Sequence, residues 1–85
     1  MSYPIVFSNS AAGQFRKIMD KKFKERIISG LEYIAKDPLI GKSLQAEFKG
    51  CNSYRMGNYR IIYSFNKEKK HIGIISINHR REVYR

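Results

Sequence analysis

Cysteine is almost absent from this sequence, and so is any long hydrophobic run. Cys51 stands alone among the 85 residues, so no internal disulfide can form, and no Cys/His spacing suits zinc. We therefore expect a reducing compartment and a cysteine that serves only in packing. No apolar stretch approaches the ~20 residues that cross a bilayer, and residues 1–7 do not resemble a signal peptide. These absences predict a cytoplasmic protein with no membrane contact and no metal or other cofactor.

Acidic side chains are also scarce. The chain has 7 Asp and Glu against 17 Lys and Arg, which gives a formal net charge of +10 at pH 7. Such an excess attracts polyanions, and on so small a domain it favours a nucleic-acid partner. An acidic protein partner would use the same field, and the two partners are compatible. The sequence has no carboxylate pair, phosphate-binding loop or metal-binding cluster, so any chemistry must use other groups.

The length and the ordinary hydrophobic content predict a single folded domain, residues 1–85. Residues 3–7 are apolar and β-branched, which predicts a strand, and Pro4 favours a sheet edge or the start of the strand. Two amphipathic helices are predicted over 11–19 and 22–36, as a helical hairpin. The remaining segments predict a three- to four-stranded antiparallel sheet joined by hairpins. The fold class is therefore α+β, with the helices on one face of the sheet.

Each helix is expected to bury one face. Apolar residues recur at three- and four-residue spacing in both segments. The expected buried positions are Ala12, Phe15, Ile18 and Met19 in the first helix and Phe23, Ile27, Ile28, Leu31 and Ile34 in the second. Asp20 lies between the helices and either breaks the first or caps the second. Gly13 weakens the first helix by up to ~1 kcal/mol relative to Ala.

A hairpin in the second half of the chain carries two arginines. Gly57 and Asn58 form a two-residue turn candidate with strand-forming residues on both sides. Arg55 on the first arm would then be a cross-strand neighbour of Arg60 on the second. Like charges so placed repel each other unless an anion lies near them. The pair is therefore either a shared anion site or two side chains that extend into water.

The chain ends in a basic segment with one aromatic ring. Its functional side chains are His79, Arg80, Arg81, Tyr84 and Arg85. A solvated tail would have this composition, but arginine also holds phosphate with paired hydrogen bonds, and aromatic rings stack on bases. RNA cleavage without a metal needs a base for the 2′-OH, positive charge for the phosphorane and an acid for the 5′-oxygen. His79 and Tyr84 can move protons, and arginine can stabilise charge.

Two segments closely resemble the RelE/ParE toxin superfamily. They are residues 53–63, Ser-Tyr-Arg-Met-Gly-Asn-Tyr-Arg-Ile-Ile-Tyr, and residues 79–84, His-Arg-Arg-Glu-Val-Tyr. Residues 7–38 are similar to the superfamily's strand and helical hairpin, so the resemblance covers essentially the whole chain. It implies the toxin of a type II toxin–antitoxin pair. The RelE-like branch implies metal-free cleavage of mRNA in the ribosomal A site, with a cognate antitoxin that wraps the toxin in a hetero-oligomer.

The resemblance also implies site residues. Members similar to RelE use basic residues and a late tyrosine, which fall here on Arg55, Arg60, Arg80 and Tyr84, and His79 stands where others have a catalytic His or a basic residue. The implied catalytic set is Arg60, His79, Arg80 and Tyr84. The implied substrate-binding set is Lys49, Arg55, Arg81 and Arg85. Lys49 is included because Gly57 stands where RelE-like toxins often have a second lysine.

Two other functions stay open. A ParE-like toxin would bind DNA gyrase and perform no chemistry. A degenerate toxin would be a basic module that binds nucleic acid or an antitoxin without catalysis. The His-Arg-Arg and Tyr84 ending favours the nuclease over the gyrase inhibitor, which needs no phosphate-cleaving groups. Gly57, and the lack of a helix after Tyr84 to brace it, favour the non-catalytic module.

Overall fold

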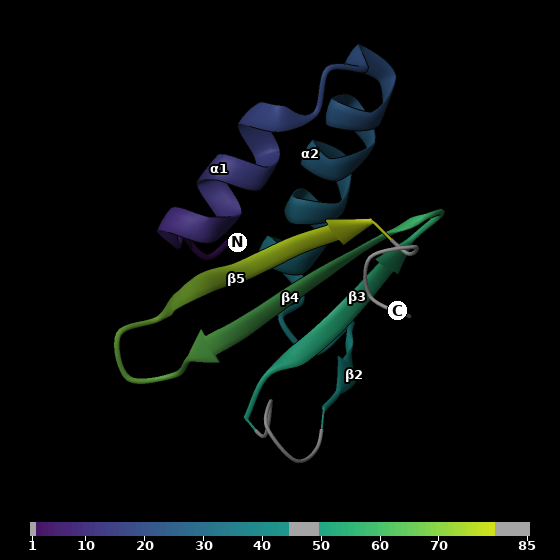
Figure 1. Ribbon diagram of the computed structural model, residues 1–85. Coiled ribbons are helices and arrows are strands. Elements are labelled where there is room, and N and C mark those ends of the chain that lie inside the picture. Colours follow the sequence, from purple (N-terminus) through teal and green to yellow (C-terminus); the bar gives the residue numbers. More distant parts are fainter. Residues whose placement is uncertain (1, 45–49, 80–85) are drawn as a thin grey trace.

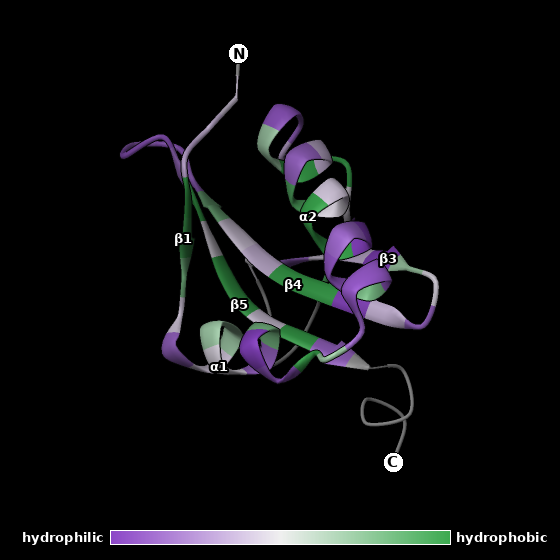
Figure 2. Ribbon diagram, turned by 90° about the horizontal axis from the view of Figure 1, so that it is seen from above, coloured by the Kyte–Doolittle hydropathy of each residue, from purple (hydrophilic) through white to green (hydrophobic). Residues whose placement is uncertain are grey.

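Two helices cover one face of a five-stranded sheet in the computed structural model, which describes residues 2–44 and 50–79 (Figures 1 and 2). The elements are β1 (Ile5–Phe7), α1 (Asn9–Lys17), α2 (Lys21–Lys36), β2 (Lys42–Ser43), β3 (Asn52–Met56), β4 (Tyr59–Asn66) and β5 (His71–His79). The strand order is β1-β5-β4-β3-β2. The predicted α+β class, the helical hairpin and the antiparallel hairpins are confirmed.

The first strand adds a feature that the sequence pattern did not predict. β1 pairs with β5 in parallel, with Ile5 opposite Ile72 and Phe7 opposite Ile74, so the sheet is mixed. Parallel neighbours require a crossover, and here the crossover contains the helical hairpin and the strands before β5. β1 is the edge strand, as Pro4 predicted, since a proline nitrogen cannot donate to a ladder.

Polar side chains fix where both helices begin. Ser8 is the N-cap of α1, and its Oγ accepts a hydrogen bond of 3.0 Å from the Ala11 N–H. Asp20 is the N-cap of α2, where one carboxylate oxygen accepts from the Lys22 N–H at 2.8 Å. The role of Asp20, left open by the sequence, is therefore to cap the second helix.

The core lies between α2 and the central strands. Ile27 and Ile34 of α2 are buried in one cluster with Ile61, Tyr63 and Ile74 of the sheet. Figure 2 shows hydrophobic colouring on β1, β5 and β4 and on parts of α2. Burial of such side chains contributes most of the stability of a domain this small.

Two predicted core positions are wrong. Met19 is 91% exposed, because α1 ends at Lys17 and the helical spacing does not continue to residue 19. Ile28 is 45% exposed, because it follows the fully buried Ile27 and lies about 100° further around the helix. Neither error changes the layer arrangement.

A buried tyrosine fixes the loop after α2. The Tyr63 hydroxyl donates to the Pro38 carbonyl at 2.8 Å and accepts from the Gly41 N–H at 3.0 Å. Asn52 Nδ2 donates to the same carbonyl at 3.2 Å. Burial raises the pKa of Tyr63 above its ordinary value of 10.0, although the hydrogen bond from Gly41 opposes the shift. This contact ties the end of the helical layer to the middle of the sheet.

High pH should weaken the fold through Tyr63. In the unfolded chain a tyrosine loses its proton near pH 10, whereas folded Tyr63 keeps it. The stability that Tyr63 contributes is therefore complete below pH 10 and is lost as the pH rises through the folded pKa. Tyr63→Phe should lower the free energy of unfolding by about 1–3 kcal/mol at neutral pH, because the Gly41 N–H loses its partner. Urea unfolding at about pH 8 and about pH 11 should show the two proteins converging, and parallel pH profiles would contradict the assignment.

Candidate nucleic-acid interface

Two arginines lie opposite each other on the β3–β4 hairpin, as predicted. Arg55 pairs with Arg60, and Arg60 pairs in turn with Asn78 of β5, so three strands contribute to one row across the sheet. Side chains directly opposite each other in an antiparallel pair have Cβ atoms about 4.5–5.5 Å apart, and like charges there are destabilising. The sheet therefore places two arginines opposite each other on neighbouring strands, and their row meets β5 one residue before the end of the described part of the chain.

The row faces away from the helices. Tyr59 contacts Phe23 of α2, with ring centroids 5.5 Å apart, and Ile61 is fully buried in the core under the helices. Successive strand residues point to opposite faces, so Arg60, between Tyr59 and Ile61, lies on the open face of the sheet. Arg55 is exposed, and Arg60 is half-buried.

The turn between the two arginines depends on glycine. Gly57 has φ +56°, and Asn58 has no positive φ, which is the pattern of a type II′ hairpin turn. A lysine at position 57 would adopt this left-handed conformation only with strain. The backbone conformation of this turn thus explains why glycine stands at position 57, where RelE-like toxins often have lysine.

Arg26 of α2 supplies a cation beside that turn, which sequence reasoning missed. A Cβ placed on Gly57 would be 3.9 Å from one Nη atom of Arg26. Arg26 and Arg55 both line a hollow of about 350 Å³, together with Ser29, Tyr54, Met56 and Gly57. β2 pairs only with Asn52 and Ser53, so this hollow lies beside a part of β3 that β2 does not cover. Arg26 and Arg55 thus give this hollow two basic residues in its lining.

Of the site residues predicted in the C-terminal segment, the structure describes His79. His79 is the last residue of β5, opposite Tyr59 in register. Lys49, Arg80, Arg81, Tyr84 and Arg85 lie outside the described residues, so their roles stay predictions.

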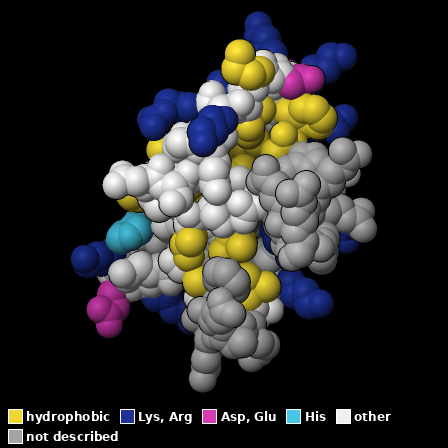
Figure 3. Space-filling view, viewed as in Figure 1, with side chains coloured by type: hydrophobic (Ala, Val, Ile, Leu, Met, Phe, Trp, Pro, Cys, Tyr) yellow, Lys and Arg dark blue, Asp and Glu magenta, His cyan; other side chains and the backbone are white. Residues whose placement is uncertain are grey.

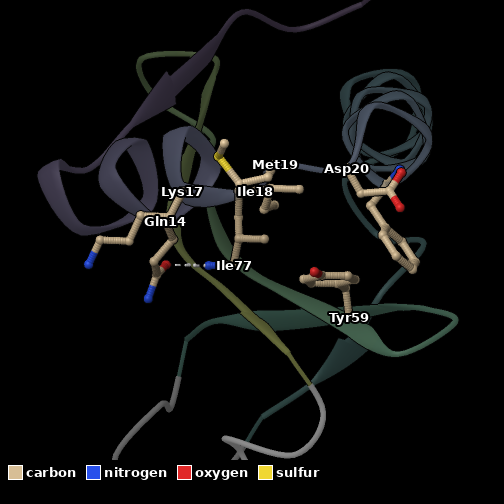
Figure 4. A pocket seen from close by; sticks show the side chains of 8 residues that line it. Gln14, Lys17, Ile18, Met19, Asp20, Tyr59 and Ile77 are labelled. Carbon is tan, nitrogen blue, oxygen red and sulfur yellow. Dashed lines mark hydrogen bonds between the residues drawn. The ribbon is translucent and has the colours of Figure 1, made fainter.

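A second hollow, of about 520 Å³, opens where the two helices meet the end of the sheet (Figure 4). Lys17 and Asp20 line it from the helices, and Tyr59 and Ile77 line it from the sheet. Gln14 of α1 also lines it, and its Oε1 accepts a hydrogen bond of 2.7 Å from the Ile77 N–H. Gln14 was not identified from the sequence. Its position could have indicated its role, because it is a polar residue on the apolar stripe formed by Ala11, Phe15 and Ile18. A polar group in such a place requires a hydrogen-bond partner.

Positive charge gathers at the α1–α2 junction at the same end of the molecule. Arg16, Lys17, Lys21 and Lys22 are all exposed there, and Figure 3 shows Lys and Arg side chains at the upper end of the view. Asp20 is the acidic residue among them, and its carboxylate is occupied by capping α2. The junction adds to the field that attracts a polyanion.

The side chains of the described residues can bind a ligand through positive charge and hydrogen bonds. Within residues 2–44 and 50–79, no three His, Cys, Asp or Glu side chains are grouped so that they could hold a metal ion. Across the same residues, none of the helices is both long and apolar enough to span a membrane. Arginine stays protonated. The arginine row and the hollow lined by Arg26 and Arg55 can therefore stabilise negative charge, but their arginines cannot move protons.

Comparison with known proteins gives consistent matches. A family model described as the ParE toxin of the type II toxin–antitoxin system parDE matches residues 5–84. Toxin RelG of Mycobacterium tuberculosis is 28% identical over 86 residues, which span 100% of this chain and 99% of that protein. A chain of the toxin–antitoxin complex RelBE2 from the same organism superposes with a TM-score of 0.81 at 25% identity, covering 94% of this chain and 100% of that one. A chain of the Escherichia coli RelBE complex gives 0.79 at 21% identity, covering 92% and 96%, and shows the shared fold.

Proposed function

Because this chain belongs to the ParE toxin family of type II toxin–antitoxin systems, within the RelE/ParE superfamily, we propose that it cleaves mRNA on the ribosome. The reaction needs no metal, and a cognate antitoxin neutralises the protein. The toxin works in the cytoplasm, where translation takes place. The similarity to Toxin RelG over the full length of both chains supports the RelE-like activity over the ParE-like one.

The observation that carries this proposal is the arginine row. Arg55 and Arg60 lie side by side on the open face of the sheet, and Arg60 is in register with Asn78, from which the chain continues into the basic tail. Guanidinium groups hold phosphate with paired hydrogen bonds. The row therefore offers two arginines to a phosphate at the place where the proposed catalytic residues begin.

The cleavage step uses the ribose beside the scissile phosphate. The 2′-oxygen loses its proton and bonds to phosphorus, the bond from phosphorus to the 5′-oxygen breaks, and that oxygen gains a proton. Arg60 and Arg80 stabilise the charge of the phosphorane, and His79 and Tyr84 carry the two protons. Lys49, Arg55, Arg81 and Arg85 hold the flanking phosphates. Arg26 joins this binding set because it shares a hollow with Arg55.

The antitoxin is proposed to be a protein with acidic segments. The two structural relatives reported above come from toxin–antitoxin complexes. A net charge of +10 attracts an acidic protein chain as well as RNA. An antitoxin that covers the arginine row would block the substrate by occupying the same charges.

The direct test is cleavage on programmed ribosomes. Purified protein should cut mRNA in the A site at a rate well above that of ribosomes alone. EDTA added in excess over trace metals should leave this cleavage in place. Gyrase inhibition without cleavage would select the ParE-like alternative, which the description of the matching family favours. Tight antitoxin binding without either activity would select the non-catalytic module and reject the nuclease.

A further inference from the structure

The outer edge of β5 changes partner along its length. β1 pairs with β5 only from Ile72 to Ile74. Beyond that point α1 supplies the partners: the Ser8 N–H donates to the Ile74 carbonyl at 2.9 Å, and the Ser8 Oγ donates to the Ile75 carbonyl at 2.8 Å. Gln14 then accepts from the Ile77 N–H. Polar side chains of a helix thus complete the edge of the strand where β1 has ended.

Gln14 uses both ends of its amide. Its Oε1 accepts from the Ile77 N–H at 2.7 Å. Figure 4 draws this hydrogen bond as a dashed line. Its Nε2 donates to the Asn78 Oδ1 at 3.2 Å, and the Asn78 Nδ2 donates to the Ser76 Oγ at 3.1 Å. One side chain therefore holds the backbone of Ile77 and orients the side chain of Asn78.

The contact of Gln14 with Ile77 and Asn78 lies beyond a change of register in the sheet. The register between β4 and β5 shifts between Ile62 and Tyr63, so that Ile75 is an extra residue, and residues 76–79 pair with β4 in a new register. β4 holds one edge of this segment, and Gln14 holds the other edge at Ile77. Asn78 is the β5 partner of Arg60. Gln14 thus fixes the strand end on which the proposed arginine row depends.

We propose that Gln14 is a positioning residue, which keeps the end of β5 in register with Arg60 for the reaction. This inference rests on the proposed nuclease. Catalytic groups must be held within about 0.5 Å of their productive positions, and a displacement of about 1 Å can cost a factor of about 100 in rate. Gln14 touches neither substrate nor scissile bond. It acts through Ile77 and Asn78.

The test compares two substitutions on the same helix. Gln14→Met keeps the length of the side chain and removes both hydrogen bonds. Ser8→Ala removes the contact with Ile75 and the cap of α1, but it removes no hydrogen bond to Ile77 or Asn78. Cleavage on programmed ribosomes should show kcat reduced by at least about tenfold in Gln14→Met, with KM for ribosomes within about threefold. Ser8→Ala should keep both constants within about threefold, at a temperature where circular dichroism shows both variants folded. Equal kcat in the two variants would overturn the proposal.

Amide hydrogen exchange separates this inference from the proposed function. In Gln14→Met the Ile77 amide should exchange at least about tenfold faster, while Ile72 and Ile74 keep their protection from β1. If the parent protein does not cleave RNA, the nuclease proposal fails, and faster exchange at Ile77 still supports the positioning of the strand end. Unchanged exchange at Ile77 would overturn it whatever the parent's activity.

Discussion

Arg60→Ala should lower the rate of mRNA cleavage at saturating ribosomes by about 100-fold, the usual effect of removing one stabilising group from a charged transition state. Arg60 lies on the open face between Arg55 and Asn78, so its loss removes the central charge of the row. Arg60→Lys should recover only part of the rate, because an ammonium group cannot make the paired hydrogen bonds of a guanidinium. Single-turnover cleavage of a defined mRNA on purified ribosomes measures each rate.

Arg16→Ala is the matched control for this result. Arg16 is an exposed arginine in the last turn of α1, so its removal changes the net charge by the same amount away from the row. We expect its rate to stay within about threefold of the parent. Arg80→Ala and Tyr84→Phe should each lower the rate at least about tenfold. Equal rates for Arg60→Ala and Arg16→Ala would show that charge alone, and not the row, matters.

Gly41→Ala should destabilise the protein by about 3 kcal/mol or more, a large part of the stability of a small domain. A Cβ at Gly41 would lie 2.7 Å from the Tyr63 hydroxyl and 2.8 Å from the Ser53 carbonyl oxygen. The carbonyl belongs to the β2–β3 ladder and cannot move away. The hydroxyl can move only by giving up its bonds to Pro38 and Gly41. Urea unfolding should show a lower midpoint with an unchanged slope.

Gly13→Ala gives the opposite expectation from the same substitution. Gly13 lies inside α1, and a Cβ there meets no heavy atom within 4 Å. Replacing a helical glycine by alanine stabilises by about 0.5–1 kcal/mol, so this variant should unfold at higher urea than the parent. A Gly41→Ala as stable as the parent would refute the packing described around Tyr63, and a destabilised Gly13→Ala would contradict the open space beside Gly13.

The local elements were predictable because their signals are local. Apolar spacing, the capping residue Asp20 and the glycine turn at Gly57 all act over a few residues. The pairing of Arg55 with Arg60 followed from the two-residue turn, which fixes the register of a hairpin. Met19 failed because the pattern continued past the true end of the helix.

The contacts that the sequence did not predict join distant parts of the chain. The parallel pairing of β1 with β5, the contact of Tyr63 with Pro38 and the contact of Gln14 with Ile77 depend on how the helical layer lies on the sheet. No periodicity specifies such partners. A polar residue on an apolar stripe indicates only that a partner exists, and Gln14 is such a residue. The same reason explains why Arg26 was overlooked: nothing near residue 26 in the sequence indicates that it faces the β3–β4 turn.

The place of β5 in the sheet sets the order in which the sheet can form. β5 follows the other described strands in the chain, yet it lies between β1 and β4, and the partners Ile5 and Ile72 are 67 residues apart. β1 therefore stays unpaired until β5 has been made, because long-range pairing forms late. The middle of the sheet is filled last, and the two flanking strands cannot complete their ladders before then.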